Sequence, residues 1–590
     1  MKPATGIVEP PDIEPESATR SQGDQWFAEH AEVLRLADAA SRARTAFTPY
    51  LESPRAHLHP VGAKARGQEW FAAVRNSALS GTAPDDAELF LPDEISPFTQ
   101  EPLGVRYARP TPEQIFSAIG NAAPSWAAAS PQERVGVCLE ALDRLHQDVF
   151  ANAYATMHTT GQPFIMAFAG SGANSLDRGL EAVVYAMRAM ADVAPAAEFR
   201  RSFGAAEVTL DKRYQIRPRG VGVVIACGSY PAWNAYPAIF ANLATGNPVV
   251  VKPHPATVLP VARAVQIVRA VLAEAGHDPN LVIMAVDTTD EPIANALIDH
   301  PATAIVDFTG SPQYGQELEQ RFDRLVFTET AGTNAVILES ARDLDAVLVA
   351  LARSLCLFSG QMCTTPQNVF VPPVVQTPTG PVPYAQVRRR LLAEIDRVAT
   401  DPRIAAATCG AVHSQTTIAA LDALAESSQL SQRDAAHSPE HVLRQHTAYE
   451  HPDFPRARTC TPLVLESAAR DDLHRAERFG PVSFLIPVQD RDEALALAAA
   501  DAAACGAIAS YCYTTDLSYA DAVESAFFAA GASIGFNLVR QAPLNFTAAF
   551  SDYHVTGLNP AGNACLTDLA FVASRFRIVQ SKTERVGAEA

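Results

Sequence analysis

Short runs of β-branched residues alternate with segments of helical spacing from residue 221 onward, and this rhythm constrains the fold more than any other feature. GVVIA at 222–226 and NPVVVK at 247–252 are apolar at almost every position, which is typical of strands buried on both faces. Helices separate these runs, so the strands are expected to be parallel and covered by helices on both sides. A second alternating region lies between 419 and 530. The sequence therefore predicts an α/β fold with a doubly wound sheet and a second α/β unit.

The composition limits the classes of protein to which this chain can belong. Of its 590 residues, 48% are hydrophobic and 19% are charged, which allows a large buried core and excludes a disordered or collagen-like chain. The 46 basic and 65 acidic residues give a net charge of −19, which argues against nucleic acid or an anionic membrane surface as the main partner. The N-terminus shows no secretory signal and the nine cysteines form no CxxC motif, so we expect a cytoplasmic protein.

Two long segments, residues 220–251 and 354–387, contain no Asp, Glu, Lys or Arg. Each exceeds the roughly 20 residues that span a bilayer, but Pro, Ser, Asn and Gln interrupt both. They therefore favour the buried interior of a soluble enzyme over a membrane span. Candidate reactive side chains lie in or beside both segments.

A cysteine and a glutamate are the candidates for catalysis. Cys363, in GQMCTT, follows a predicted helix, and a partly buried thiol becomes a nucleophile when its surroundings lower its pKa. Glu329, in FTETAGTN, is the only carboxylate between Asp323 and Glu339, and an isolated acid among small and apolar residues suits a general base. Each residue taken alone is more often structural, as a core thiol or a surface charge. Their occurrence together favours catalysis.

Two further segments have the features of a nucleotide site. Lys252 ends the apolar run NPVVVK, and a Lys at the carboxyl end of a parallel strand points into the crevice where such sheets bind ligands. FTGSPQYG at 308–315 predicts a strand, a turn at Gly310–Ser311 and a helix that opens near Gly315. Backbone N–H groups at such a helix N-terminus can meet a pyrophosphate. Metal motifs such as HExxH are absent, so no metal site is predicted.

Taken in order, these segments resemble the aldehyde dehydrogenase superfamily. GNPVVVKP resembles its GNTVVxKP strand, FTGSPQYG its FTGSxxxG turn, FTETAGTN its LELGGKN loop, SGQMC its GQxC motif, and ERFGPV at 477–482 its ExFGPV cofactor clamp. The family usually separates its glutamate and cysteine by 34 residues, as Glu329 and Cys363 are here (363 − 329 = 34). The resemblance covers residues 95–583. It implies an aldehyde dehydrogenase-like α/β fold with a Rossmann-type cofactor domain, an α/β catalytic domain and a β hairpin and tail for oligomerisation.

The resemblance assigns a role to each residue of these motifs. Cys363 would be the thiolate that attacks the carbonyl of a small-molecule aldehyde, and Glu329 would activate the water that hydrolyses the resulting thioester. The cofactor would be held by the remaining motif residues, which are Lys252, Gly310, Ser311, Gly315, Glu477 and Phe479.

Two residues compete for the role of oxyanion donor. The family commonly has Asn-Phe-Pro ahead of the helix that precedes its GN strand. Counting back without gaps from Gly246 places Ser229 at the Asn position, and Asn234 lies five residues further on. The ungapped count favours Ser229, whose hydroxyl would donate alongside the backbone N–H of Cys363.

The sequence favours NADP over NAD as the cofactor. NAD-preferring relatives often have a Glu three residues after the Lys, where it binds the ribose 2′-hydroxyl, and this chain has Pro255 there. Without that carboxylate a 2′-phosphate is tolerated, and Lys252 and His254 are placed to contact it. NAD is the alternative.

Three segments resemble the PaaN-type branch of the superfamily, which is linked to bacterial phenylacetate breakdown. They are the N-terminal extension, CGSYPAWNAYP and FSDYHVTGLNPAGNACLTDLAFVASRF. The branch implies oxidation of a CoA-linked, ring-opened aldehyde, 3-oxo-5,6-dehydrosuberyl-CoA semialdehyde, to the acid. One alternative is a CoA-acylating aldehyde dehydrogenase, although such relatives often lack a base like Glu329. Another is a catalytically silent binding protein, which the intact site residues argue against.

We expect four regions along the chain. Residues 1–94 would form a helical extension without chemistry, 95–327 the cofactor domain, 328–550 the catalytic domain and 551–590 a C-terminal segment. A hairpin at about 206–218 and a strand in the tail resemble the sheet through which the family oligomerises. The resemblance therefore implies a homodimer or homotetramer.

Overall fold

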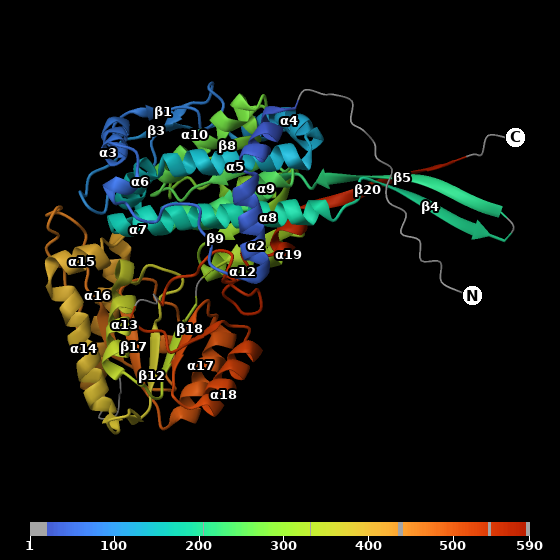
Figure 1. Ribbon diagram of the computed structural model, residues 1–590. Helices are drawn as coiled ribbons and strands as arrows, with labels where there is room; N and C mark the ends of the chain where they lie inside the picture. Colours follow the sequence, from blue (N-terminus) through green and yellow to red (C-terminus); the bar gives the residue numbers. More distant parts are fainter. Residues whose placement is uncertain (1–19, 205, 331, 435–440, 541–543, 586–590) are drawn as a thin grey trace, which may run out of the picture.

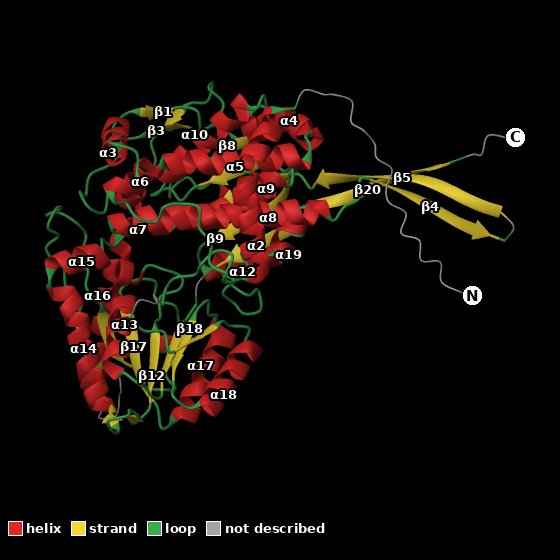
Figure 2. Cartoon of the chain, in the orientation of Figure 1, coloured by secondary structure: helices red, strands yellow, loops and turns green. Residues whose placement is uncertain are grey.

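Two α/β units and a projecting β arm dominate the computed structural model (Figure 1). The structure describes residues 20–204, 206–330, 332–434, 441–540 and 544–585. Figure 2 shows one unit rich in helices around a smaller sheet, a second unit around a larger sheet, and an arm of long strands that leaves the body of the molecule. This architecture confirms the predicted α/β fold class.

The first unit is built on a parallel sheet that has five strands in the described chain. Its inner strands consist mostly of buried Val and Ile, as expected when helices cover both faces. The chain begins in the middle strand, winds to one edge and then to the other, which leaves a ligand-binding crevice at the carboxyl ends of the strands. In spatial order the strands are β10 (Leu325–Glu329), β9 (Thr303–Thr309), β6 (Val221–Ile225), β7 (Val249–Lys252) and β8 (Val282–Met284).

The register of this sheet brings predicted site residues to one edge. Ile225 pairs with both Lys252 and Phe308, and Thr309 pairs with Glu329, so these strand ends are level. Glu329 is the last residue of β10, so the expected domain border between residues 327 and 328 falls inside this strand. The helices that connect the strands are α9 (Pro231–Ala244), α10 (Leu259–Glu274), α11 (Ala294–Asp299) and α12 (Pro312–Arg321).

The second unit has a sheet of seven strands among the described residues, parallel except where β15 pairs with β16. In spatial order the strands are β15 (His441–Arg444), β16 (Leu463–Glu466), β17 (Val482–Pro487), β12 (Asn368–Val371), β11 (Ala335–Leu338), β18 (Ser510–Tyr513) and β19 (Ile534–Phe536). Its main helices are α13 (Leu344–Cys356), α14 (Tyr384–Thr400), α16 (Gln415–Asp434), α17 (Arg491–Cys505) and α18 (Leu517–Ala529). Cys363 lies between α13 and β12, on the side that faces the first unit.

The arm corrects one prediction. It consists of β4 (Ala196–Phe203), β5 (Ala206–Pro218) and β20 (Phe576–Glu584), with β5 in the middle and both pairings antiparallel. The sequence prediction placed the hairpin at 206–218 and therefore missed β4. AAEFRRSF shows no regular alternation of apolar and polar residues, because nearly the whole strand is exposed and no buried face selects its side chains.

The residues before the first sheet wrap around it. A Cβ on Gly136 would lie 1.9 Å from the carbonyl oxygen of Gly23, so the crossing of α1 over α5 requires glycine. In the same way, Gly67 allows α3 to approach α6 at Phe150. The elements of this layer are α1 (Gln22–Glu29), α2 (Ala31–Ala43), α3 (Ala63–Val74), β1 (Ala78–Leu79), β2 (Leu89–Phe90), β3 (Arg106–Ala108), α4 (Pro112–Ala128), α5 (Pro131–Gln147), α6 (Val149–Thr160) and α8 (Ser175–Ala191).

The first segment without charged residues forms interior structure, as predicted, but the second does so only as far as residue 372, because most of residues 373–386 are exposed or half-buried. Residues 220–251 make up β6, α9 and most of β7, and residues 354–387 run from the end of α13 through β12 into α14. Within the described ranges, no helix is long and apolar enough to cross a bilayer.

A buried ion pair ties the C-terminal segment to the first sheet. The guanidinium of Arg575 donates to both carboxylate oxygens of Asp307 on β9, at 2.8 Å (Nη1–Oδ2) and 2.5 Å (Nη2–Oδ1).

Arg575 is fully buried, so Arg575→Met should lower the free energy of unfolding by about 3–5 kcal/mol by leaving the Asp307 carboxylate unpaired. Urea unfolding measures the loss. Arg577→Met, at the next but one position and exposed, is the control and should change stability by less than about 0.5 kcal/mol. Equal losses in both variants would contradict this account.

Candidate active site

Cys363 lies in a loop that is held in a sharp turn. After α13, Phe358 and Ser359 have φ angles of 49° and 50°, which residues with a Cβ rarely adopt. Such strain costs on the order of 1–3 kcal/mol and persists only where packing enforces it. Asn334 holds the other side of the loop, because its Nδ2 donates to the carbonyl oxygens of Cys363 at 2.8 Å and Thr365 at 2.9 Å. The fold therefore fixes the position of Cys363.

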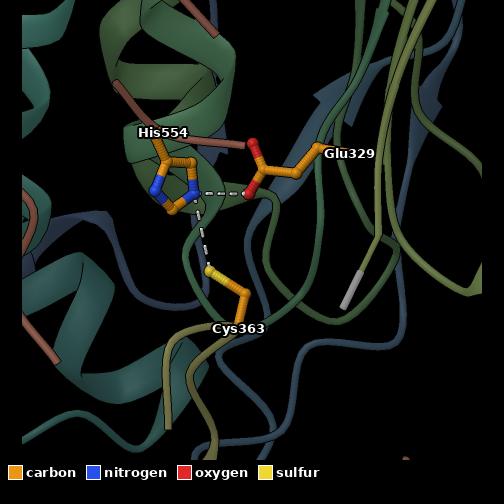
Figure 3. Close-up of side chains that lie close together, drawn as sticks. All are labelled: Glu329, Cys363 and His554. Carbon is orange, nitrogen blue, oxygen red and sulfur yellow. Dashed lines mark hydrogen bonds and ion pairs between the residues drawn. The ribbon is translucent and has the colours of Figure 1, made fainter. Parts of the chain in front are cut away.

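A histidine joins the two predicted catalytic residues (Figure 3). Glu329 is the last residue of β10, and its side chain is 6% exposed. His554 Nε2 lies 2.9 Å from Glu329 Oε1 and 3.8 Å from Cys363 Sγ, so the imidazole contacts both groups. The sequence analysis missed His554. Its only signal was a single His in FSDYHVTGL, and a lone His has the same local appearance as a packed core residue.

The surroundings of Cys363 favour its neutral thiol. Burial raises the pKa of this thiol well above its usual range, and the carboxylate of Glu329 raises it further. Cys227 and Glu477 act in the same direction. The reactive form is the thiolate, so the site needs a group that stabilises negative charge on the sulfur.

Both candidate oxyanion donors line the cavity that holds Cys363. Burial raises the pKa of Cys227, and the neighbouring Ser229 side chain acts against that rise, so Ser229 lies beside a second thiol of the cavity wall. Asn234 lies in α9 and is 6% exposed, and its Nδ2 has no hydrogen-bond partner among the described residues. A buried amide N–H without a partner is costly, by about 1–3 kcal/mol, unless a ligand satisfies it. The geometry thus leaves Asn234 free to donate.

The N-terminus of α12 forms a wall of the same cavity. Gly310 and Ser311 line it, and Ser311 is the N-cap of the helix. A Cβ on Gly310 would lie 2.6 Å from the Phe308 ring, so only glycine fits at this position. The absence of a side chain also leaves the backbone open to a ligand. The free N–H groups and the dipole of a helix N-terminus suit a pyrophosphate. Gly315 is not part of the cavity wall, since it lies inside α12 and lets the helix pack on Thr330.

Lys252 lines the cavity as predicted, but it is already paired. Its Nζ lies 2.8 Å from Oδ1 of Asp287, whose side chain is 1% exposed and which the sequence analysis did not single out. His254 also lines the cavity, and burial lowers its pKa to about 4. Burial likewise lowers the pKa of the neighbouring His413 to about 3. Lys252 is therefore the one cation at neutral pH among the described residues that line the cavity, and the Asp287 carboxylate balances it.

Glu477 and the 41% exposed Phe479 line the cavity beside these groups, where the resemblance assigns Glu477 to the cofactor ribose. Burial raises the pKa of Glu477 to about 7.

As the pH falls through 7 the Glu477 carboxylate becomes neutral, and the hydrogen bonds that it would accept from ribose hydroxyls weaken. We expect the cofactor Kd to rise about fivefold between pH 8 and pH 6, and Glu477→Gln to remove this dependence. Fluorescence titration measures both; an equal dependence in the Gln variant would rule out this role.

The cavity has a volume of about 1130 Å³ and also holds Cys363, Glu329 and His554. A further part of its wall is largely apolar and comes from α7 (Phe164–Phe168) and a π-helix (Ala169–Asn174). Glu52, from the N-terminal extension, completes this part and accepts a 2.7 Å hydrogen bond from Asn174 Nδ2. The extension was expected to carry no chemistry. Instead it contributes a carboxylate to the cavity.

Comparisons with known proteins agree with this geometry. The sequence model described as "Aldehyde dehydrogenase family" matches residues 89–547. A crystal structure described as an NAD-dependent aldehyde dehydrogenase from Burkholderia multivorans is 38% identical, with a TM-score of 0.90. That match covers 95% of this chain and 99% of the Burkholderia chain.

More distant relatives share parts of the sequence or the fold. The 1-pyrroline-5-carboxylate dehydrogenase 2 of Bacillus subtilis is 27% identical over 273 residues, which are 44% of this chain and 49% of that protein. The chain thus matches about half the length of this curated relative. A 1-pyrroline-5-carboxylate dehydrogenase from Thermus thermophilus, 19% identical, has the same fold, with a TM-score of 0.69 over 91% of this chain and 99% of its own. Motifs, fold and comparisons lead to one assignment: the chain belongs to the aldehyde dehydrogenase family.

Proposed function

We propose that this protein oxidises an aldehyde to the carboxylic acid, with NAD or NADP as cofactor. The observation that carries the proposal is a cavity in which Cys363 and Glu329 meet the N-terminus of α12 and Lys252. Cys363 Sγ would attack the carbonyl carbon while Asn234 Nδ2 donates to the oxygen. The bound cofactor supplies the hydride acceptor. Glu329 would then activate a water that hydrolyses the thioester on Cys363.

The charges around Lys252 bear on the choice of cofactor. Pro255 removes a carboxylate that would repel a 2′-phosphate, which is the basis of the predicted NADP preference. Against this, Asp287 already neutralises Lys252, and the low pKa of His254 leaves it uncharged at pH 7. A phosphate dianion would therefore meet no uncompensated cation among the described residues that line the cavity. We propose that NAD is the preferred cofactor, contrary to the preference inferred from Pro255.

The wall formed by α7, the π-helix and Glu52 bears on the aldehyde. It is apolar apart from the Glu52 carboxylate and the Asn174 amide, and in the described chain it contains no Lys or Arg. We propose an aldehyde with an apolar body next to the reacting carbon. The CoA-linked semialdehyde of the PaaN-type branch fits when its charged CoA portion stays outside this wall. A substrate such as 1-pyrroline-5-carboxylate, named for the Bacillus relative, carries a carboxylate for which this wall offers no cation.

A screen of free and CoA-linked aldehydes with both cofactors tests these proposals through the near-ultraviolet absorbance of the reduced cofactor. We expect turnover with an apolar aldehyde, a higher kcat/KM with NAD than with NADP, and no turnover in Cys363→Ser. Formation of acyl-CoA on addition of CoA would identify the CoA-acylating alternative, which the proximity of Glu329 to Cys363 disfavours. If no aldehyde is oxidised with either cofactor, the silent binding protein becomes the better description.

We also infer that the arm contacts a second copy of the chain. The three strands of the arm leave the body of the molecule (Figure 1), and Phe203, Ile578 and Val579 on them are each more than half exposed. Light scattering should show a dimer or a tetramer; a monomer would refute this inference.

A further inference from the structure

We propose that His554 is a further catalytic residue, whose Nε2–H passes its hydrogen bond from Glu329 to the sulfur of Cys363 as the thiol ionises. The proposal rests on the dehydrogenase activity proposed above. Figure 3 shows the arrangement that carries it: one ring nitrogen faces both the carboxylate and the thiol.

The two distances define the resting state. Nε2 lies 2.9 Å from Glu329 Oε1, a normal hydrogen-bond length, and 3.8 Å from Cys363 Sγ. A single N–H cannot point at both atoms, so in the resting state it donates to the closer, charged carboxylate. The sulfur is the second acceptor within reach of the same N–H.

Two unpaired atoms identify where the proton of the thiol can go. Glu329 Oε2 and His554 Nδ1 are buried and have no hydrogen-bond partner among the described residues. When the proton of the neutral imidazole is on Nε2, Nδ1 carries no hydrogen and therefore needs no acceptor. Glu329 can therefore accept a proton at Oε2 while Oε1 is still in contact with His554.

The step balances without any other reactant. The Cys363 S–H bond breaks and its proton binds Glu329 Oε2, so the carboxylate becomes a neutral acid. The negative charge now lies on sulfur, and His554 Nε2–H turns its hydrogen bond to the thiolate. Once the thioester has formed, Glu329 releases its proton to water in the cavity and is again a carboxylate for hydrolysis.

The loop that carries His554 is built to hold the ring in place. The imidazole packs edge-on against Trp233, with 4.5 Å between the ring centroids and 72° between the planes. The next residue, Val555, has a φ of 59°, a strained conformation for a β-branched side chain, and is 2% exposed. Val555 packs with Ile508 and Ala561, and this packing enforces the strain. Strain of this kind is characteristic of functional sites.

Few other ionisable groups influence this pair. Cys227, Glu477, Tyr230 and Tyr511 are near enough to Cys363 to interact with its charge. The guanidinium of Arg178 lies 5.2 Å from the centroid of the Trp233 ring on which His554 packs. None of these contacts a nitrogen of His554 in the described structure, so Glu329 and Cys363 are its hydrogen-bonding partners.

The test measures the rate at which iodoacetamide alkylates Cys363 as a function of pH, by mass spectrometry of the Cys363 peptide from the full chain. Alkylation needs neither aldehyde nor cofactor, so its result does not depend on the proposed activity. His554→Phe keeps an aromatic ring against Trp233 and removes the N–H. We expect the apparent pKa of Cys363 to rise by about one to two units, and His554→Gln, which retains an N–H, to recover at least half of this shift. EDTA is present throughout, because the Glu329, Cys363 and His554 ligand atoms lie within 4.8 Å of one another and could share a metal ion.

The control is a second histidine–carboxylate pair outside the cavity. His446 Nε2 lies 2.9 Å from Asp422 Oδ1, and His446→Gln should leave the alkylation profile unchanged. With a substrate in hand, the first turnover of His554→Phe should be about 10–100-fold slower at neutral pH, with an unchanged cofactor Kd. His554→Leu replaces His554→Phe if the latter does not fold. An alkylation profile that coincides with that of the unmodified chain, or a Gln variant that behaves like Phe, would overturn the proposal.

Discussion

Glu329→Gln should form the acyl-enzyme on Cys363 more slowly, because the thiol must then release its proton to water, and should hydrolyse it about 10²–10⁴-fold more slowly than the unmodified protein. The amide of Gln can still contact His554, so the nucleophile keeps its hydrogen-bonding neighbour. It cannot take a proton from water, so release of the acid becomes the slowest step. Mass spectrometry during turnover should therefore find the acyl group attached to Cys363, while the steady-state rate falls.

Two comparisons make this result specific. Glu426→Gln, at an exposed position of α16, should have unchanged turnover. His554→Phe should show the opposite pattern, with slow formation of the acyl-enzyme and no accumulation. If Glu329→Gln loses turnover without any adduct on Cys363, the carboxylate acts only as the acceptor of the thiol proton, and its assignment to the hydrolytic water is wrong.

The parallel sheet of the first unit could be predicted because its signal is local. Runs such as Val249–Val251 are apolar at every position, and such a strand is stable only with helices on both faces. Lys252 ends such a run, so its place at the carboxyl edge followed from the same pattern. Cys363 and Glu329 were identified from motif resemblance and spacing, and the structure brings their ligand atoms within 4.8 Å.

The features that were missed depend on contacts between distant parts of the chain. His554 meets Cys363 across 191 residues, and Glu52 meets Asn174 across 122 residues. His554 lies in the tail segment that resembles the PaaN-type branch, but that resemblance gave the residue no role, and Glu52 lies in no motif. Periodicity reports only whether a local face is buried. The strand β4 was missed for a related reason, since an exposed arm has no buried face to impose alternation.

Asn234→Ala should lower kcat by about 10²–10³-fold, the usual cost of losing one oxyanion donor. Its Nδ2 is buried in the cavity wall and has no partner among the described residues, as expected of a donor whose acceptor is the substrate oxygen. The cofactor Kd should stay unchanged, because the lost interaction forms only as charge develops on the carbonyl oxygen.

Ser229→Ala is the matched variant and should lower kcat by less than tenfold, since Asn234 would still donate to the oxyanion and the substitution leaves the Ser229 carbonyl, which accepts from Gln162 at 2.9 Å, in place. Thermal unfolding of both variants separates a loss of turnover from a loss of structure. The opposite order, with turnover lost only in Ser229→Ala, would show that the ungapped alignment from Gly246 is correct. The free amide of Asn234 would then have to be satisfied by water, because no described residue pairs with it.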